Sequence, residues 1–481
     1  MTAEEQHNSE KIVYYFLSNL DNLRSLSEAE GRDVLHLASY TAFHCQNSIL
    51  KNKCLDLLYH CCFYLKDIDL KELWNIYWIL NRALFTDYNV RLTGNIDELY
   101  KHIFVIVLKK ITDQYERLEA GSNLILMVTS QFLGINHAPT RRILDYSYTI
   151  ATSLHKRVMI INDAGLNYYP CACLEQNFTP AYFPELNNTK IISYKEINIP
   201  FMQIPGYMPD IYSLKENLRE IYQLQPELVY NIGGSSIFAD LCSLFTKTAC
   251  FPCSTNIPQS MSKYLLVGRN LNESDKLRLE RMESYQEIIE TVVNYELQES
   301  PKQYTRTEFG IPSDSFVIGV IGNRLDSEIS DEFICLMDMA INQFDVHFLI
   351  IGSIIEENRI KNNVMRSQNL HFTGYLSETS EAMKLLDIYW NSKRSGGGRS
   401  SFEALANGIP VTTLKFGDVY YTCGNEFGVE KDSDFLQQLD LYINEKEYLK
   451  TMKKKSLERA ACLSDLPGTQ KKILEQILGK I

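Results

Sequence analysis

The sequence has no long apolar run and no excess of basic residues. No stretch approaches the roughly 20 apolar residues that a helix needs to cross a bilayer, and the opening decapeptide MTAEEQHNSE has no apolar signal-peptide core. Lys and Arg number 48 against 60 Asp and Glu, for a net charge of -12, whereas nonspecific binding to nucleic acid needs clustered cations. We therefore expect a cytoplasmic protein without a transmembrane segment that binds no nucleic acid.

The sequence also lacks a recognisable metal-binding pattern. Its 12 cysteines are irregularly spaced, and the pairs in CAC (171–173) and CFPC (250–253) fit no standard zinc site, which needs four converging ligands. The two Asp-x-Asp runs, from Asp67 and from Asp432, suit helix caps or surface positions. We predict reduced thiols, no metal site and no cofactor.

The chain is too long for one hydrophobic core, and its pattern of apolar residues changes twice. Residues 1–118 carry helical periodicity, as in LKELWNIYWILNRALF, which predicts an all-α domain. Residues 119–300 and 301–481 each alternate short apolar runs with helical segments, which is typical of a parallel sheet covered on both faces. The predicted fold class is therefore α/β, with two Rossmann-like domains preceded by an all-α helical domain. The charged stretch 270–300 predicts a helical connection between the last two.

Glycine is scarce, with 23 residues in 481, yet three are consecutive in WNSKRSGGGRSSFEALANGIPVTTL. Gly396, Gly397 and Gly398 follow a predicted strand, and Ser400 or Ser401 can cap the helix that comes next. A helix N-terminus binds anions through its N–H groups and its dipole. Arg394 and Arg399 would add charge-assisted hydrogen bonds, so a diphosphate suits this loop. The alternative is a plain strand-to-helix turn with solvated arginines.

The phrases FGIPSDSFVIGVIGNRL, NLHFTGYL and SGGGRSSFEALANGIPVTTL, in this order, resemble the nucleotide-binding half of GT-B glycosyltransferases. The resemblance covers roughly residues 122–465. It implies two Rossmann-like domains, of which the second holds a nucleoside-diphosphate sugar and the first holds the acceptor. Arg324 matches an arginine that many of these enzymes place on the diphosphate, and Tyr375 lies where the base and sugar pocket is expected.

Two branches of this fold resemble the chain in different ways. In the large retaining branch, related to glycosyltransferase family 4, two glutamates stand eight positions apart, and Glu403 in FEALANGIPV matches the second while Ser395 replaces the first. The segment GRSSFEAL is similar to the phosphate loop of the branch that contains O-GlcNAc transferases and bacterial protein glycosyltransferases. That resemblance implies Gly398, Arg399, Ser400 and Ser401 at the phosphates and Glu403 at the ribose. A helix-surface acid is the alternative for Glu403.

Two loops of the first Rossmann-like domain are candidates for the acceptor side. FLGINHAPT resembles a loop of the O-GlcNAc transferase branch and implies that Asn136 lines the pocket and that His137 binds or deprotonates the acceptor. A structural histidine is the alternative. The loop at the end of ELVYNIGG is similar to another loop of that branch, and the resemblance implies that Asn231, Gly233 and Gly234 lie in the acceptor or sugar pocket.

Taken together, these features predict a glycosyltransferase that moves a hexose or N-acetylhexosamine from a nucleoside-diphosphate sugar, with UDP-sugar favoured, to a protein or peptide. It would work without metal and invert the anomeric centre, because Ser395 replaces the expected glutamate. The helical domain could bind a protein partner. The alternatives are a transferase that builds a capsule or cell-wall glycan, and a non-catalytic GT-B-like binding subunit of a glycosylation complex.

Overall fold

The computed structural model describes residues 1–481 except 88, 120–121, 136, 176–180, 298–301 and 480–481. The chain divides into two compact units, Met1–Thr291 with Gln470–Ile481, and Val292–Thr469. The sequence predicts three domains, but the helical region and the first sheet share one hydrophobic core. Tyr77 and Leu99 of the helices belong to the same buried cluster as Leu126 and Val229 of the sheet.

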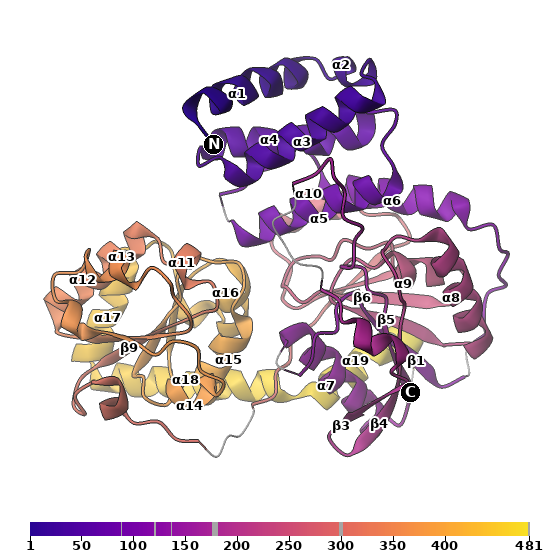
Figure 1. Cartoon of the computed structure of the whole chain (residues 1–481). Helices are drawn as coiled ribbons and strands as arrows, with labels where there is room; N and C mark the ends of the chain where they lie inside the picture. The colour runs from indigo at the N-terminus through magenta and orange to yellow at the C-terminus, as the bar shows by residue number, and fades with distance from the viewer. Residues whose placement is uncertain (88, 120–121, 136, 176–180, 298–301, 480–481) are drawn as a thin grey trace. The chain divides into compact units, whose positions relative to one another are not determined.

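In the amino-terminal part of the first unit, the described residues form six helices. Three of them begin with capping boxes, in which Thr2, Ser27 and Asp69 pair with a glutamate three residues later. Figure 1 shows α1 to α4 as an outer layer, with α5 and α6 nearer the sheet. The helices are α1 (Ala3–Ser18), α2 (Asp21–Arg24), α3 (Glu28–His44), α4 (Ser48–Tyr64), α5 (Leu70–Thr86) and α6 (Ile96–Lys110).

The first unit also contains an eight-stranded sheet in the order β3-β4-β2-β1-β5-β6-β7-β8, parallel except for the β3–β4 pair. The strands are β1 (Leu124–Thr129), β2 (Arg157–Asn162), β3 (Ile191–Tyr194), β4 (Ile197–Gln203), β5 (Leu228–Ile232), β6 (Lys247–Phe251), β7 (Tyr264–Val267) and β8 (Glu287–Glu290). The longer helices that connect them are α7 (Ala138–Thr152), α8 (Ile211–Leu224) and α9 (Ile237–Leu241).

The predicted helical connection over residues 270–300 is wrong. This stretch contains only the short helices η3 (Glu273–Asp275) and α10 (Lys276–Leu279) before β8. In β8 the β-branched residues Ile288 and Ile289 pair with β7, and the glutamates at both ends of the strand are exposed, as suits the edge of a sheet.

The second unit contains a six-stranded parallel sheet in the order β11-β10-β9-β12-β13-β14. The strands are β9 (Val317–Ile321), β10 (His347–Ile351), β11 (Leu370–Phe372), β12 (Ile388–Trp390), β13 (Val411–Leu414) and β14 (Gly428–Val429). The α-helices are α11 (Leu325–Glu328), α12 (Asp331–Phe344), α13 (Glu357–Lys361), α14 (Thr379–Met383), α15 (Gly398–Ala406), α16 (Gly417–Cys423), α17 (Asp434–Asn444) and α18 (Lys446–Ser464). Helix α19 (Leu466–Leu478) leads back to the first unit, where Lys247 Nζ donates to the carbonyl of Ile477 at 2.8 Å.

Each sheet has a point where the direction of winding reverses. In the first sheet it lies between β1 and β5, and in the second between β9 and β12. Ligands of open α/β sheets bind beyond the carboxyl ends of the strands at such a switch point. The loops that follow these four strands, together with the start of α15, contain most of the predicted site residues that the structure describes. The predicted α/β fold with two Rossmann-like sheets and a helical amino-terminal region is confirmed.

Candidate functional site

The glycine-rich loop leads from β12 directly into α15. Helix α15 begins at Gly398, and its N-cap is Gly397, whose φ of 105° is favourable only for glycine. A Cβ atom on Gly398 would lie 2.5 Å from the Tyr295 hydroxyl oxygen. Gly396 is buried in the same loop. Backbone conformation and close packing therefore account for Gly397 and Gly398.

The two serines of the loop do not cap the helix as predicted. Ser400 Oγ donates to the carbonyl of Gly397 at 2.9 Å, and Ser401 Oγ donates to the carbonyl of Gly398 at 2.8 Å. Because the N-cap is a glycine, no side chain bonds to the first N–H groups of α15 from that position. The first N–H groups of a helix have no intrahelical partner, so they suit an anion.

Arg394, predicted to contact phosphate, lies beneath the loop and is only 7% exposed. It donates from Nε to Asn391 Oδ1 (2.9 Å), from Nη1 to Glu328 Oε2 (2.9 Å) and from Nη2 to the Tyr389 hydroxyl (2.5 Å). Burial opposes its charge, but the neighbouring Tyr389 and Glu328 keep the pKa of Arg394 raised. All three guanidinium nitrogens thus bond to side chains around the loop, and contact of Arg394 with phosphate stays a prediction.

Glu403 and Arg399 lie one turn apart on α15. Arg399 Nε donates to Glu403 Oε1 at 3.0 Å, and Thr379 Oγ1 donates to Glu403 Oε2 at 3.3 Å. The Glu403 side chain is 11% exposed. A carboxylate has about four acceptor positions, so these two contacts fix its orientation and leave capacity for hydroxyl donors.

Arg324 and Tyr375 follow two other strands of the same sheet. Arg324 comes after β9, and its side chain is 41% exposed and contacts Glu328 Oε1 through Nε and Nη2, both at 3.1 Å. Tyr375 comes after β11 and is 67% exposed. The loops after β9 and β10 lie against each other. A Cβ atom on Gly352, after β10, would lie 1.9 Å from the carbonyl oxygen of Gly322, after β9.

Glu328 is a site residue that sequence reasoning missed. It accepts from both Arg324 and Arg394 and thereby joins the loop after β9 to the loop after β12. The spacing of four residues between Arg324 and Glu328 suggests a helical ion pair. No local pattern indicates the contact with Arg394.

In the first unit, His137 caps α7 after the loop that follows β1. Its Nδ1 lies 3.0 Å from Thr140 Oγ1, which also accepts from the backbone N–H of Leu133 at 2.8 Å. Burial lowers the pKa of His137 to about 4. The imidazole is therefore neutral at pH 7, the form that can accept a proton. Asn136, its predicted neighbour in the pocket, lies outside the described residues.

The low pKa of His137 predicts a contribution to acid sensitivity. A histidine in an unfolded chain titrates near pH 6.5, so the unfolded state binds this proton more tightly. The contribution of neutral His137 to the free energy of unfolding is fully present above pH 6.5, and it is lost as the pH falls toward about 4. We expect urea unfolding to show that, between pH 7.5 and pH 4.5, the free energy of unfolding falls more for the parent than for His137→Asn. Equal losses would contradict this effect.

Asn231, predicted to line the pocket, bonds to the loop after β5. It is fully buried, and its Nδ2 donates to the carbonyl of Gly234 and to Cys250 Sγ at 3.4 Å. Gly233 and Gly234 have φ values of 134° and 112°, which allow the chain to turn sharply here. The two glycines therefore lie at the predicted edge, with Asn231 beneath them.

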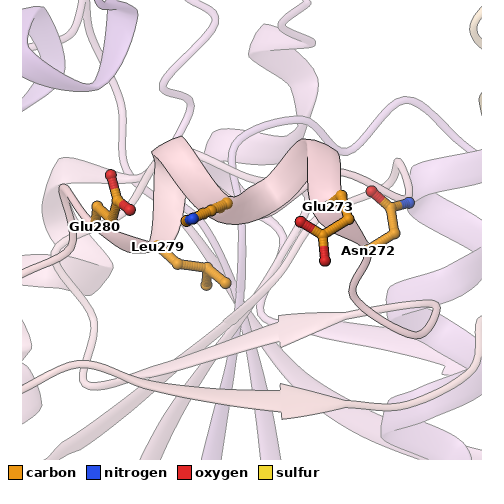
Figure 2. A pocket seen from close by; sticks show the side chains of 5 residues that line it. Asn272, Glu273, Leu279 and Glu280 are labelled. Atoms are coloured by element: carbon orange, nitrogen blue, oxygen red, sulfur yellow. The ribbon is translucent and has the colours of Figure 1, made fainter.

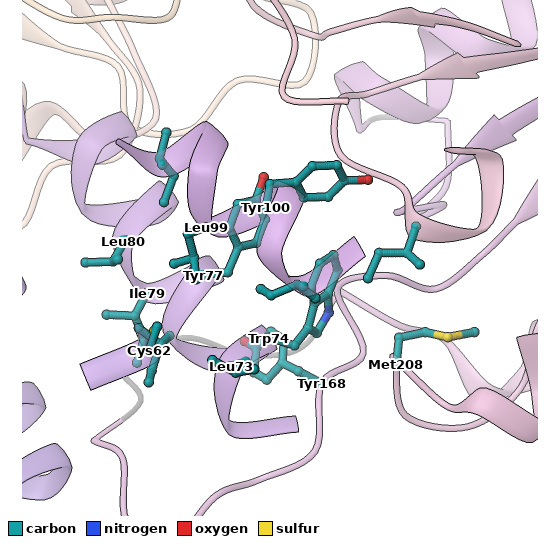
Figure 3. Close-up of a cluster of buried hydrophobic side chains, with 14 of the residues drawn as sticks. Cys62, Leu73, Trp74, Tyr77, Ile79, Leu80, Leu99, Tyr100, Tyr168 and Met208 are labelled. Carbon is teal, nitrogen blue, oxygen red and sulfur yellow. The ribbon is translucent and has the colours of Figure 1, made fainter. Parts of the chain in front are cut away.

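Three aromatic side chains of the helical region bond to this edge of the first sheet. Trp74 Nε1 donates to the carbonyl of Gly165 at 2.8 Å, beyond β2. The Tyr77 hydroxyl bonds to Ser235 Oγ, beyond β5, and the Tyr100 hydroxyl donates to Asp240 Oδ2 of α9 at 2.6 Å. Figure 3 shows these rings packed together in the buried cluster that also includes Tyr168 and Met208. The helical region thus bonds to the loop after β5, which carries Gly233 and Gly234, and to two neighbouring segments of the first unit.

A surface depression of about 450 Å³ lies over α10 in the first unit. Asn272, Glu273, Lys276, Leu279 and Glu280 line it (Figure 2). It follows β7, two strands from the switch point at β1 and β5, and it contains none of the predicted site residues. We therefore place the candidate site at the switch points and not in this depression.

Solved structures of glycosyltransferases are similar to the chain in fold. An O-GlcNAc transferase mutant from Thermobaculum terrenum superposes with a TM-score of 0.54 at 13% identity, over 98% of this chain and 94% of that one. A glycosyltransferase from Rickettsia africae gives 0.52 at 14% identity, over 74% of this chain and 98% of that one. Anabaena Alr3699/HepE in complex with UDP gives 0.51 at 12% identity, over 73% and 98%.

No protein-family model matches the sequence, and no curated protein matches it. Within the described ranges, no helix is both long enough and apolar enough to cross a membrane. The two parallel sheets and the structural neighbours establish the GT-B fold.

Proposed function

We propose that this chain, which has the GT-B fold, is a cytoplasmic glycosyltransferase. It takes a hexose or N-acetylhexosamine from a nucleoside-diphosphate sugar, with UDP-sugar favoured, and transfers it to a protein or peptide. The similarity in fold to an O-GlcNAc transferase over 98% of the chain and to a UDP-bound protein supports this donor and acceptor class. The helical region α1–α6 is proposed to bind the polypeptide acceptor or a protein partner.

The observation that carries the proposal is the loop of residues 391–398 at the switch point of the second sheet. It brings the N-terminus of α15, Arg399 and Glu403 to the edge where Arg324 and Tyr375 also lie. The leaving nucleoside diphosphate gains negative charge, which fixed N–H groups and arginines can stabilise. Glu403 can accept hydroxyl protons of the ribose in hydrogen bonds. We therefore propose that no metal is needed.

In the proposed reaction, an acceptor hydroxyl oxygen attacks the anomeric carbon while the bond from that carbon to the diphosphate oxygen breaks. Neutral His137 takes the hydroxyl proton, and the diphosphate leaves with the electron pair of the broken bond. Ser395 offers no carboxylate for a second displacement, which favours inversion of the anomeric centre. The predicted roles of Gly233 and Gly234 in the acceptor pocket are part of this proposal.

The test is to incubate the purified chain with UDP-, GDP- and dTDP-sugars, alone and with peptide or glycan acceptors. We expect a thermal shift with one nucleotide family and transfer of the sugar to peptide. Transfer to glycan alone would favour the capsule or cell-wall alternative. Binding without any turnover would favour a binding subunit, and no binding to any donor would contradict the proposal.

Substitution of Gly398 tests whether the start of α15 binds the donor. In Gly398→Ala the new Cβ lies 2.5 Å from the Tyr295 hydroxyl and 2.9 Å from Thr422 Oγ1, so the first turn of the helix or these two side chains must shift. We expect donor affinity to fall at least tenfold in calorimetric titration. Gly428→Ala is the matched control, because its Cβ meets Tyr420 at 2.7 Å in the same unit but outside the loop. Equal donor binding by both variants would rule out this role for α15.

A further inference from the structure

A buried cluster of charge joins the two loops at the switch point of the second sheet. Glu328 ends α11, after β9, and its carboxylate accepts from Arg324 through Oε1 and from Arg394 through Oε2. Both Glu328 and Arg394 have side chains less than a tenth exposed. The Glu328 carboxylate therefore binds two arginines, Arg324 at the surface and Arg394 in the interior.

Two glycines make room for this ion pair. A Cβ on Gly322 would lie 2.8 Å from both Arg394 Nη1 and Glu328 Oε2, and a Cβ on Gly397 would lie 2.7 Å from Arg394 Nη2. The pair is thus enclosed between the end of β9 and the N-cap of α15. Removing one partner of a buried ion pair leaves an uncompensated charge, which costs far more than the pair contributes. The position of Gly397 consequently depends on Glu328 through Arg394.

Arg324 depends on Glu328 in a different way. Its side chain is 41% exposed, and a long exposed side chain loses rotamer freedom when it is fixed on a ligand. The contact of both Nε and Nη2 with one carboxylate oxygen holds the plane of the guanidinium before any ligand arrives. Such preorganisation increases affinity by lowering the entropic cost of binding.

We propose that Glu328 is a positioning residue that aligns Arg324 with the second phosphate of a nucleoside diphosphate, while Arg394 holds the glycine loop against the same group. This inference rests on the proposed function. Glu328 does not touch the ligand and acts through the two arginines. Its carboxylate also limits the positive charge of the cluster, since two arginines and one glutamate leave a net charge of one.

The experiment measures how strongly the full chain prefers a nucleoside diphosphate over the matching monophosphate. UDP and UMP are titrated by calorimetry, together with GDP and GMP, and with dTDP and dTMP. We expect the parent chain to bind one diphosphate at least tenfold more tightly than its monophosphate. In Glu328→Gln we expect that preference to fall to threefold or less, with monophosphate affinity unchanged within twofold. A purely structural defect would weaken both ligands equally.

Two further variants keep the test decisive if Glu328→Gln folds poorly. The double variant Glu328→Gln with Arg394→Met removes both charges of the buried pair and should still lack the diphosphate preference. Arg324→Ala should lower the same preference, and adding Glu328→Gln to it should lower the preference by a smaller factor than Glu328→Gln does in the parent, because part of the effect of Glu328 acts through Arg324. The matched control is Asp387→Asn, which removes the carboxylate paired with Arg306 just before β12, at the opposite edge of the sheet.

The outcomes separate this inference from the function on which it rests. An unchanged diphosphate preference in Glu328→Gln overturns the inference and leaves the proposed function intact. Tighter diphosphate binding also overturns it, because the carboxylate would then act by repulsion. If the parent chain binds none of the nucleotides, both the proposed function and this inference are wrong.

Discussion

Glu403→Gln is expected to lower kcat/KM for sugar transfer about a hundredfold, mainly through weaker donor binding. The carboxylate is nearly buried and oriented by Arg399 and Thr379, so it is prepared to accept two ribose hydroxyls. Glutamine keeps the shape but replaces one acceptor oxygen by a donor, and each charge-assisted hydrogen bond lost costs about 1.5–3 kcal/mol. Steady-state kinetics with varied donor concentration measure the effect.

Glu381→Gln is the matched control for this substitution. Glu381 is also nearly buried and pairs with Lys384 on α14 at 2.7 Å, but it is not among the proposed donor ligands. We expect its donor KM to stay within twofold of the parent. If Glu403→Gln and Glu381→Gln change donor KM alike, Glu403 does not bind the ribose.

Asp240→Ala is expected to destabilise the first unit by about 3 kcal/mol, because buried hydrogen-bond donors without an acceptor cost about 1–3 kcal/mol each. The fully buried carboxylate accepts from the Tyr100 hydroxyl, from Ser260 and Ser262, and from the backbone N–H of Met261. Alanine leaves these donors and a cavity behind. Urea unfolding monitored by tryptophan fluorescence measures the loss.

Asp240→Asn distinguishes the acceptor role of this residue from its charge. Burial raises the pKa of Asp240 despite its hydrogen bonds, so the charge itself is not what stabilises the fold. The amide oxygen can still accept from Met261 and Tyr100, and the Ser260 and Ser262 hydroxyls can turn to accept from the two amide N–H groups. We expect Asp240→Asn to lower the free energy of unfolding by less than half as much as Asp240→Ala.

Asp113→Asn is a control at a partly exposed ion pair with Arg219. It should lower the free energy of unfolding by under about 1 kcal/mol.

Local sequence signals predicted the sheets and the loops of the candidate site well. Apolar runs such as FVIGVIG predict the buried strands, and the three consecutive glycines predict the strand-to-helix turn before α15. The edge strand β8 was missed, because two glutamates beside two isoleucines match a charged helix as well as a strand. The N-cap was assigned to a serine, because a glycine cap with positive φ gives no polar side chain to recognise.

What the sequence could not predict depends on contacts between distant residues. The local pattern predicts that Arg394 contacts phosphate, but it gives no sign of the bond to Glu328, 66 residues away. The three bonds from α5 and α6 to the first sheet join residues 91 to 158 positions apart. Nothing in the local pattern of Trp74, Tyr77 or Tyr100 distinguishes an anchor to a sheet from an ordinary core residue of a helical bundle.

These anchors make the helical region and the first sheet one cooperative unit of folding. Trp74 bonds to a loop of the sheet and Tyr100 bonds to α9, so α5 and α6 cannot open without exposing donors and acceptors on both sides. A cut between residues 118 and 119 would therefore divide a core and not a linker. Any change of acceptor specificity made by exchanging the helical region would need the loops beneath it to be exchanged as well.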